Sequence, residues 1–175
     1  MTLYRGERAS MLPTLQTAGI QAKERWLSQE RGFPAIHFEK LMMYVRKPGF
    51  LEFVIAEIGP VITKHVVRGK LSPLVSFSAN ERVARTYALS GGQTAEGLLL
   101  TVSVTIVEAR DWTAFPEPGS GLLRDHAGRV WVHVPSFREP ASAHPAHVPL
   151  GRRDDEYLLL GDLTPSDFDV QVVRL

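Results

Sequence analysis

The sequence contains no cysteine and no long apolar run, and its charges almost cancel. The absence of cysteine from its 175 residues excludes disulfides, thiolate metal sites and a cysteine nucleophile. No apolar stretch approaches the roughly 20 residues of a membrane-spanning helix. The first residues also lack the basic-then-apolar pattern of a signal peptide. We therefore expect neither a disulfide-stabilised protein nor a membrane protein.

The composition is that of a globular domain, with 44% hydrophobic and 22% charged residues. At this length we expect a single domain spanning residues 1–175. The net charge is +1, but residues 1–110 hold 14 Lys and Arg against 9 Asp and Glu, and residues 111–175 hold 6 against 10. This asymmetry has two interpretations, a solvated surface or a basic half that faces an anionic ligand.

The hydrophobic pattern predicts helices mainly in the first half of the chain and strands in the second, which favours an α+β fold. A strand ends at Gly6, and the sequence Ser78-Ala79-Asn80-Glu81 predicts a capping box that opens a helix with Val83, Ala84, Tyr87 and Ala88 buried. The other predicted helices are Gln21–Glu30, Ile36–Lys47 and Phe50–Ile58. The other predicted strands are Val61–Val67, Pro73–Ser78, Gly97–Glu108, Arg129–Val134, Glu156–Gly161 and Phe168–Leu175, with loops over 110–128 and 136–153.

Three polar features lie at the ends of predicted strands. Arg5 ends the first strand, and Ser76 and Ser78 share one strand face because side chains alternate with period two. Asp154 and Glu156 share a face at the start of an otherwise apolar strand. If these ends converge, they bring together a guanidinium, two hydroxyls and two carboxylates. Such a set suits a ligand that carries phosphate and a sugar that becomes cationic in the transition state.

These motifs give the sequence a family resemblance. Tyr4-Arg5-Gly6, then Ser76-Phe77-Ser78 before a helix with Tyr87-Ala88, then Asp154-Asp155-Glu156-Tyr157-Leu158, resemble the Arg–Ser–Glu class of ADP-ribosyltransferases, many of which are bacterial toxins. The resemblance spans almost the whole chain. It implies split mixed β-sheets, mainly antiparallel, with NAD in the cleft between them.

The resemblance also implies a role for each matching residue. Arg5 would contact an NAD phosphate, and the backbone of Gly6 would hold the nicotinamide amide. Ser76 would brace the catalytic carboxylate or touch the ribose, and Ser78, also among the NAD-binding residues, would cap the helix. Glu156 would accept the ribose 2′-hydroxyl and stabilise the oxocarbenium ion. NAD is then a substrate, and the mechanism requires no metal.

The sequence departs from the family pattern near the catalytic glutamate. Enzymes that modify arginine have Glu or Gln two residues before it, whereas this chain has the shorter Asp154. The resemblance implies that the segment 144–153 recognises the acceptor, so we expect Arg152 and Arg153 at its end, and Asp154 directly after it, to take part in acceptor recognition. The altered residue leaves two acceptors open, a nucleic acid such as RNA or a protein side chain.

The sequence therefore predicts a mono-ADP-ribosyltransferase toxin. The resemblance implies delivery by secretion into a target-cell cytoplasm, as the C-terminal part of a larger polypeptide, and a cognate immunity protein. Two alternatives remain open, an NAD glycohydrolase that depletes NAD and a non-catalytic binding module of the same fold.

Single residues of these motifs also have interpretations without a function. Arg5 also fits an ordinary surface arginine, and Asp154 fits a solvated turn. His144 and His147 would make an incomplete metal pair in a proline-rich loop.

Overall fold

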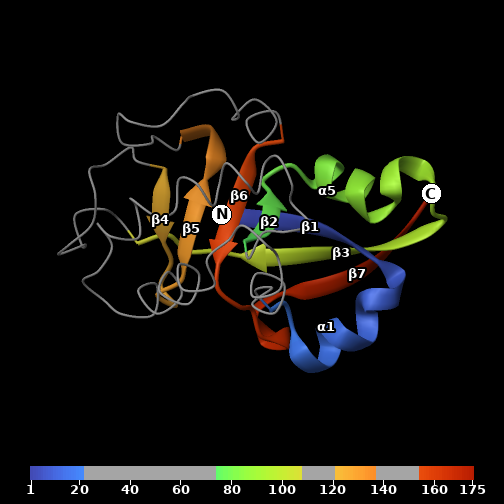
Figure 1. Ribbon diagram of the computed structural model, residues 1–175, viewed down its shortest axis with the longest axis horizontal. Helices are drawn as coiled ribbons and strands as arrows, with labels where there is room; N and C mark the ends of the chain where they lie inside the picture. The colour runs from blue at the N-terminus through green and yellow to red at the C-terminus, as the bar shows by residue number, and fades with distance from the viewer. Residues whose placement is uncertain (22–73, 108–120, 137–153) are drawn as a thin grey trace, which may run out of the picture.

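The computed structural model describes residues 1–21, 74–107, 121–136 and 154–175 (Figure 1). In these ranges seven strands form one sheet in the order β4-β5-β6-β2-β1-β3-β7. The strands are β1 (Thr2–Arg8), β2 (Val75–Ser78), β3 (Glu96–Ser103), β4 (Leu122–Arg124), β5 (Val130–His133), β6 (Glu156–Leu160) and β7 (Asp169–Arg174). The α-helices are α1 (Leu12–Ala18) and α5 (Glu81–Ala88), and the 3-10 turns are η1 (Ala9–Met11), η3 (Ser90–Gly92), η5 (Val134–Ser136) and η7 (Pro165–Asp167).

Two groups of strands meet at a narrow seam in this sheet. β1 pairs with β3 along its whole length, and β2 pairs with β6 along its whole length. Between the groups, β1 and β2 pair only through Tyr4 and Ser78. In Figure 1 the β4-β5-β6-β2 group runs across the direction of the β1-β3-β7 group. The architecture is therefore α+β and mostly strands, with one sheet that changes direction at the seam.

The expectation of mixed sheets is wrong for the described residues, since every described strand pair is antiparallel. The apolar strand predicted over 156–161 is present as β6, which lies between β5 and β2 inside the sheet. Its residues Leu158 to Leu160 are all buried, as a strand covered on both faces requires. Both described α-helices lie before residue 89, as expected.

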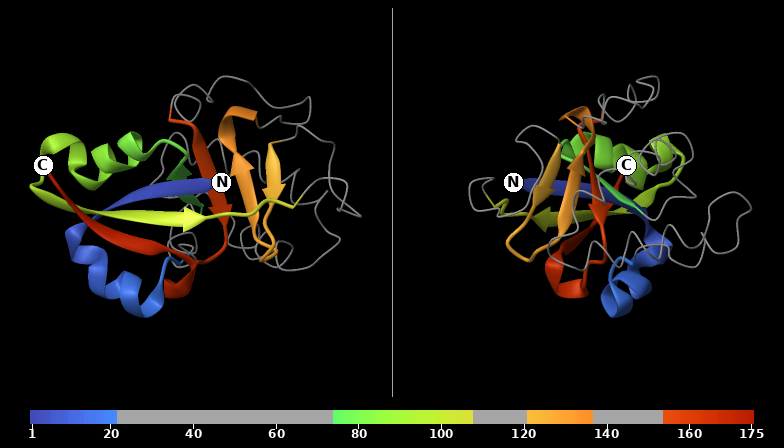
Figure 2. Two further views of the ribbon diagram at one scale, coloured as in Figure 1. Left: turned by 180° about the vertical axis from the view of Figure 1, so that it is seen from behind. Right: turned by 60° about the vertical axis from the view of Figure 1, so that its left-hand side comes forward.

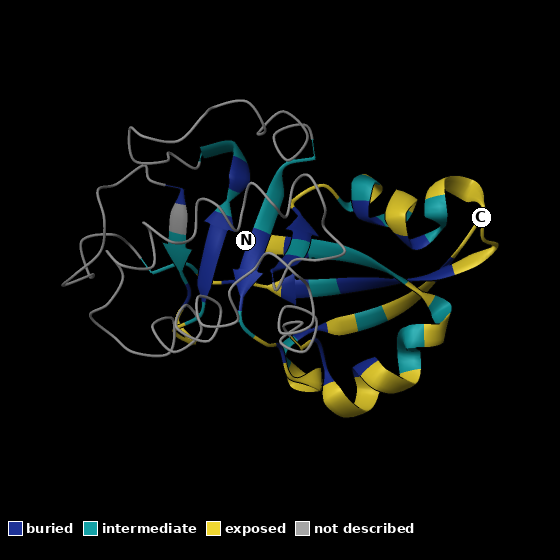
Figure 3. Ribbon diagram, in the orientation of Figure 1, coloured by how far each residue is buried: buried dark blue, intermediate teal, exposed yellow. Residues whose placement is uncertain are grey.

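The two helices cover opposite faces of the β1-β3-β7 group (Figure 2). Leu15 of α1 joins the main core, which contains Leu3 and Leu100 as well as the edge-to-face ring pair of Phe77 and Trp131. On the other face a smaller cluster contains Ala84 and Ala88 of α5, Leu99 of β3 and Val173 of β7. Figure 3 shows the resulting pattern, with buried strands in the middle and exposed outer helix faces.

Glycines let helix α5 lie directly on the backbone of the sheet. A Cβ atom at Gly6 would stand 2.1 Å from the carbonyl oxygen of Ala84, and one at Gly97 would stand 2.2 Å from the carbonyl oxygen of Ala88. Real Cβ atoms do not approach backbone so closely, and small residues on both elements allow the contact. Gly6 is thus required by packing, whatever its role in ligand binding.

Some predicted boundaries are wrong because pairing with neighbouring strands overrides local signals. The first strand does not end at Gly6 but continues to Arg8, since β3 provides partners for all of it. The strand predicted over Gly97–Glu108 ends at Ser103. The predicted loop 110–128 contains β4, which pairs with β5.

The capping box is also placed wrongly. Asn80, rather than Ser78, is the N-cap of α5, and its side chain accepts the Arg82 amide at 3.0 Å. Ser78 belongs to the ladder with β6, so its backbone cannot open the helix. Tyr87 was expected inside but is 64% exposed, because α5 turns only Ala84 and Ala88 fully toward the sheet.

Several predictions fall outside the described residues. These are the helices over 21–30 (all but its first residue), 36–47 and 50–58, the strand over 61–67, and most of the loop over 136–153. Within the described ranges, no helix has the length and apolar character needed to span a membrane.

Candidate active site

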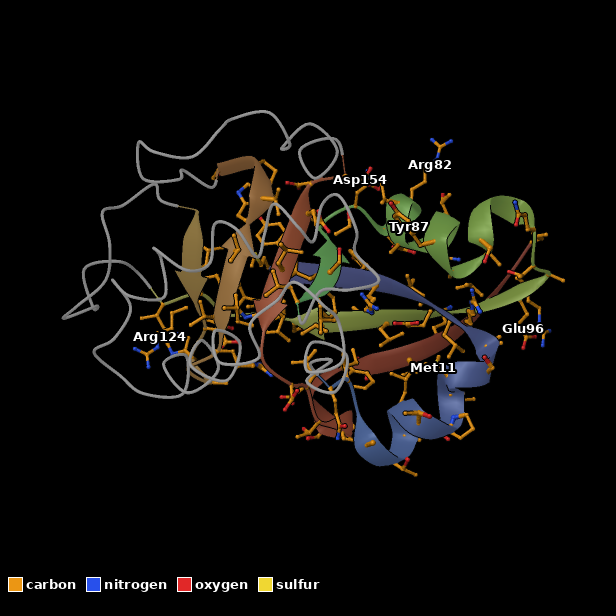
Figure 4. All side chains as sticks on the ribbon, in the orientation of Figure 1. Met11, Arg82, Tyr87, Glu96, Arg124 and Asp154 are labelled. Atoms are coloured by element: carbon orange, nitrogen blue, oxygen red, sulfur yellow. The ribbon has the colours of Figure 1, made fainter. Side chains whose placement is uncertain are left out.

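A pocket of about 620 Å³ opens where β1 and β2 separate beyond their single pair. Its polar side is lined by Arg5, Glu7, Ser76 and Glu156. Its apolar side is lined by residues of η1 and α1, including Met11 and Leu15. Figure 4 shows Met11 on one side of β1 and the neighbouring Tyr87 and Asp154 on the other. The volume lies in the range of pockets that hold small ligands and cofactors.

The centre of the polar side is a hydrogen bond between neighbouring strands. The hydroxyl of Ser76 on β2 donates to Oε1 of Glu156 at the start of β6. Ser78 is the direct pairing partner of Glu156, so Ser76 lies two residues further along the same face and reaches it diagonally. A carboxylate held by a hydroxyl has a fixed direction, which electrostatic stabilisation of a cation requires.

Arg5 reaches the same place from β1. Its Nη1 donates to the backbone oxygen of Ser76 at 2.7 Å, and its Nε donates to Oε1 of Glu7 at 2.7 Å. The guanidinium also lies 6.0 Å from the ring centre of Phe77. Arg5 is therefore fixed on several sides while its side chain stays 22% exposed. A fixed, partly exposed guanidinium suits a phosphate ligand.

The second serine holds the turn that leads into β6. Ser78 is buried, and its hydroxyl donates to the backbone oxygen of Asp154 at 2.5 Å. The carboxylate of Asp154 accepts the hydroxyl of Tyr87 at 3.1 Å, at the rim of the pocket (Figure 4). The function of Ser78 in the structure is therefore to anchor this turn, whereas the helix cap belongs to Asn80.

The predicted site residues that fall in the described ranges come together. Arg5, Gly6, Ser76, Ser78 and Glu156 all line the pocket, and so does Asp154. Arg152 and Arg153, proposed for acceptor recognition, lie outside the described residues, as do His144 and His147. The condition set by the sequence is therefore met in that the three segments line one pocket, although Arg5 lies inside β1 rather than at its end.

Sequence reasoning missed two partners of the site. Glu7 was not considered, although it stands two residues after Arg5 and therefore faces the same side of β1. His133 was given no role, yet its Nε2 lies 2.9 Å from Oδ1 of Asp155, the residue before Glu156. The first partner could have been found from strand periodicity. The second required knowledge that β5 pairs with β6.

Comparison of the sequence with models of known protein families and with curated proteins gives no match.

Proposed function

We propose that this chain is an NAD-dependent mono-ADP-ribosyltransferase that acts as a bacterial toxin. One observation carries the proposal. Ser76 donates to the Glu156 carboxylate while Arg5 donates to the Ser76 backbone, and all three line one pocket. The three residues are those that the Arg–Ser–Glu resemblance assigns to NAD cleavage.

The proposed reaction breaks the bond between the nicotinamide nitrogen and C1′ of the ribose. Nicotinamide leaves with the bonding electron pair, and positive charge develops on the ribose as an oxocarbenium ion. The Glu156 carboxylate stabilises this charge and accepts the 2′-hydroxyl. An acceptor nucleophile then attacks C1′ and loses a proton, so the ADP-ribose becomes attached to the acceptor.

The other residues divide the remaining tasks. Nε and Nη2 of Arg5 face the Glu7 carboxylate and Nη1 donates to the Ser76 backbone, so Arg5 holds an NAD phosphate through the second N–H group of each terminal nitrogen. Ser76 keeps Glu156 directed into the pocket. Asp154 stands at the rim and takes part in acceptor recognition. The apolar side next to Met11 and Leu15 offers a surface to a flat, weakly polar part of the ligand.

The test follows the fate of NAD labelled in its adenylate part. The purified chain is incubated with this NAD and a whole-cell lysate, free nicotinamide is measured, and products are treated with nuclease or protease. We expect attached label and nicotinamide release, both lost in Glu156→Gln and kept in Glu96→Gln. Glu96 is the matched control because it is a half-exposed glutamate paired with Arg174 at the far end of the sheet.

Each outcome has a defined meaning. Label removed by nuclease alone identifies a nucleic-acid acceptor, and label removed by protease alone identifies a protein acceptor. Nicotinamide release without attached label makes the chain an NAD glycohydrolase. A folded sample that releases no nicotinamide contradicts the enzymatic proposal and leaves the binding module. Secretion as part of a larger polypeptide and a cognate immunity protein belong to the same proposal.

A further inference from the structure

The turn before Glu156 has an unusual backbone. Asp155 has a φ angle of 48°, in the left-handed region that residues other than glycine seldom adopt. Its backbone oxygen accepts the amide of Ala79 at 3.2 Å, and the preceding backbone oxygen, of Asp154, accepts the Ser78 hydroxyl. This conformation therefore determines where both carbonyl groups point and how the chain enters β6 at Glu156.

The side chain of Asp155 is held by His133 of β5. Oδ1 of Asp155 lies 2.9 Å from Nε2 of His133, and Nδ1 of that ring lies 2.6 Å from the Ser136 hydroxyl. The ring also stacks on Tyr157, with ring centres 4.5 Å apart. Because a carboxylate only accepts, Nε2 carries the proton of this bond whether the ring is neutral or charged. His133 is thus fixed on three sides, and it fixes Asp155 in turn.

This contact lies on the face of the sheet opposite to Glu156. His133 pairs with Tyr157, and their side chains share one face, whereas Glu156 and Ser76 share the other. His133 consequently does not reach the pocket and can act on Glu156 only through the backbone of the turn. Burial and the nearby charge of Asp155 both raise the pKa of Tyr157, so its ring remains a neutral stacking surface at neutral pH.

We infer that His133 is a positioning residue for Glu156, acting through Asp155. The His133–Asp155 bond holds Asp155 in its left-handed conformation and so aims the first residue of β6 into the pocket. As a statement about catalysis, the inference rests on the proposed function. As a statement about the turn, it stands on this geometry alone.

The activity test compares kcat and KM for nicotinamide release. In His133→Ala we expect kcat to fall about tenfold while KM for NAD changes less than about twofold, because the NAD-binding groups stay in place. In Asp155→Ala we expect a similar fall in kcat. In Asp155→Gly the fall in kcat should be smaller, because glycine adopts the left-handed region freely. Asp155→Asn should remain within about twofold, since asparagine tolerates this region and still accepts the His133 bond. His126→Ala, at an exposed histidine of the β4–β5 turn, is the matched control.

A double substitution tests whether His133 acts through Asp155. Adding His133→Ala to Asp155→Gly should lower kcat by a further factor of less than about two, because glycine adopts the left-handed conformation without the His133–Asp155 bond. An additional tenfold fall would overturn the inference, as would an unchanged kcat in His133→Ala alone when the wild type cleaves NAD.

A measurement independent of activity separates this inference from the proposed function. Hydrogen exchange of the Ala79 amide reports the bond to the Asp155 carbonyl directly. We expect exchange to accelerate about tenfold or more in His133→Ala and to stay unchanged in Asp155→Asn. An unchanged exchange rate of the Ala79 amide in His133→Ala would refute the inference that the His133–Asp155 bond holds the turn. If the wild type does not cleave NAD but exchange accelerates in His133→Ala, the proposed function fails while the role of the His133–Asp155 bond in the turn stands.

Discussion

The two groups of strands are held together by different means. The β1-β3-β7 group has long, uninterrupted pairing, and α5 lies on it with backbone nearly touching backbone. The β4-β5-β6-β2 group has shorter strands, and its pocket end is fixed by hydrogen bonds of Ser76, Ser78 and His133. Both groups contribute to the main core, but Arg5 lies inside a long paired strand, while Glu156 stands at a strand end that these polar contacts fix.

The largest expected effect breaks the packed group. Gly6→Ala inserts a Cβ atom into the backbone of α5, so we expect a loss of about 3 kcal/mol in the free energy of unfolding. Denaturant unfolding measures this, with Thr2→Ala at the exposed start of β1 as control. A loss below about 1 kcal/mol would mean that α5 does not lie on β1 as described.

The next largest effect tests the proposed contact between Arg5 and an NAD phosphate. Arg5→Lys keeps the charge but loses the fork that binds Glu7 and Ser76, so we expect the Kd for NAD to rise about tenfold. Arg8→Lys, exposed at the end of the same strand, should leave the Kd unchanged. Equal affinities in the two variants would remove Arg5 from the binding site.

A similar but smaller effect is expected on the polar side. Ser76→Ala leaves Glu156 without its hydroxyl donor, and we expect kcat to fall about fivefold to tenfold with little change in KM. Steady-state nicotinamide release measures this, and Ser103→Ala at the exposed end of β3 serves as control. A rise in KM without a change in kcat would assign Ser76 to NAD binding instead of to Glu156.

The smallest effect concerns a contact away from the pocket, where Asp167 of η7 pairs with Arg129, the residue before β5. Burial alone would raise the pKa of Asp167, but hydrogen bonds from Thr164 and the charge of Arg129 hold that pKa below its usual value. A lowered pKa stabilises the fold above the ordinary aspartate pKa of about 4 and loses this stabilisation as pH falls through the lowered pKa.

Asp167→Asn should therefore destabilise the protein at pH 7, by under about 1 kcal/mol because the pair is partly exposed. The difference from the wild type should shrink as the pH drops below about 4. Denaturant unfolding curves of both proteins at pH 7 and at a pH below about 4 check this. A difference that grew toward low pH would contradict the assigned direction of the shift.

Much of the site could be predicted because period-two alternation is a property of the chain alone. It placed Ser76 and Ser78 on one strand face, and the structure brings both to the pocket while Phe77, between them, is buried against Trp131. What failed depends on partners distant in sequence. The pairing of Ser78 with Glu156 displaced the predicted cap, and the contact of Gly6 with α5 gave that glycine a packing role. The exposure of Tyr87 follows from the same close packing, because the narrow space between α5 and the sheet accommodates only the small side chains of Ala84 and Ala88.

The central claim is that Glu156 acts on the transition state in an NAD pocket at the seam. Its most direct test titrates NAD into Glu156→Gln by calorimetry and measures nicotinamide release by the same sample. The account predicts that the Kd of this variant for NAD lies within about threefold of the wild-type KM. It also predicts a loss of about a thousandfold in kcat, because the carboxylate acts on charge that develops only during bond cleavage. Undiminished turnover, or no NAD binding by a folded sample, would contradict it.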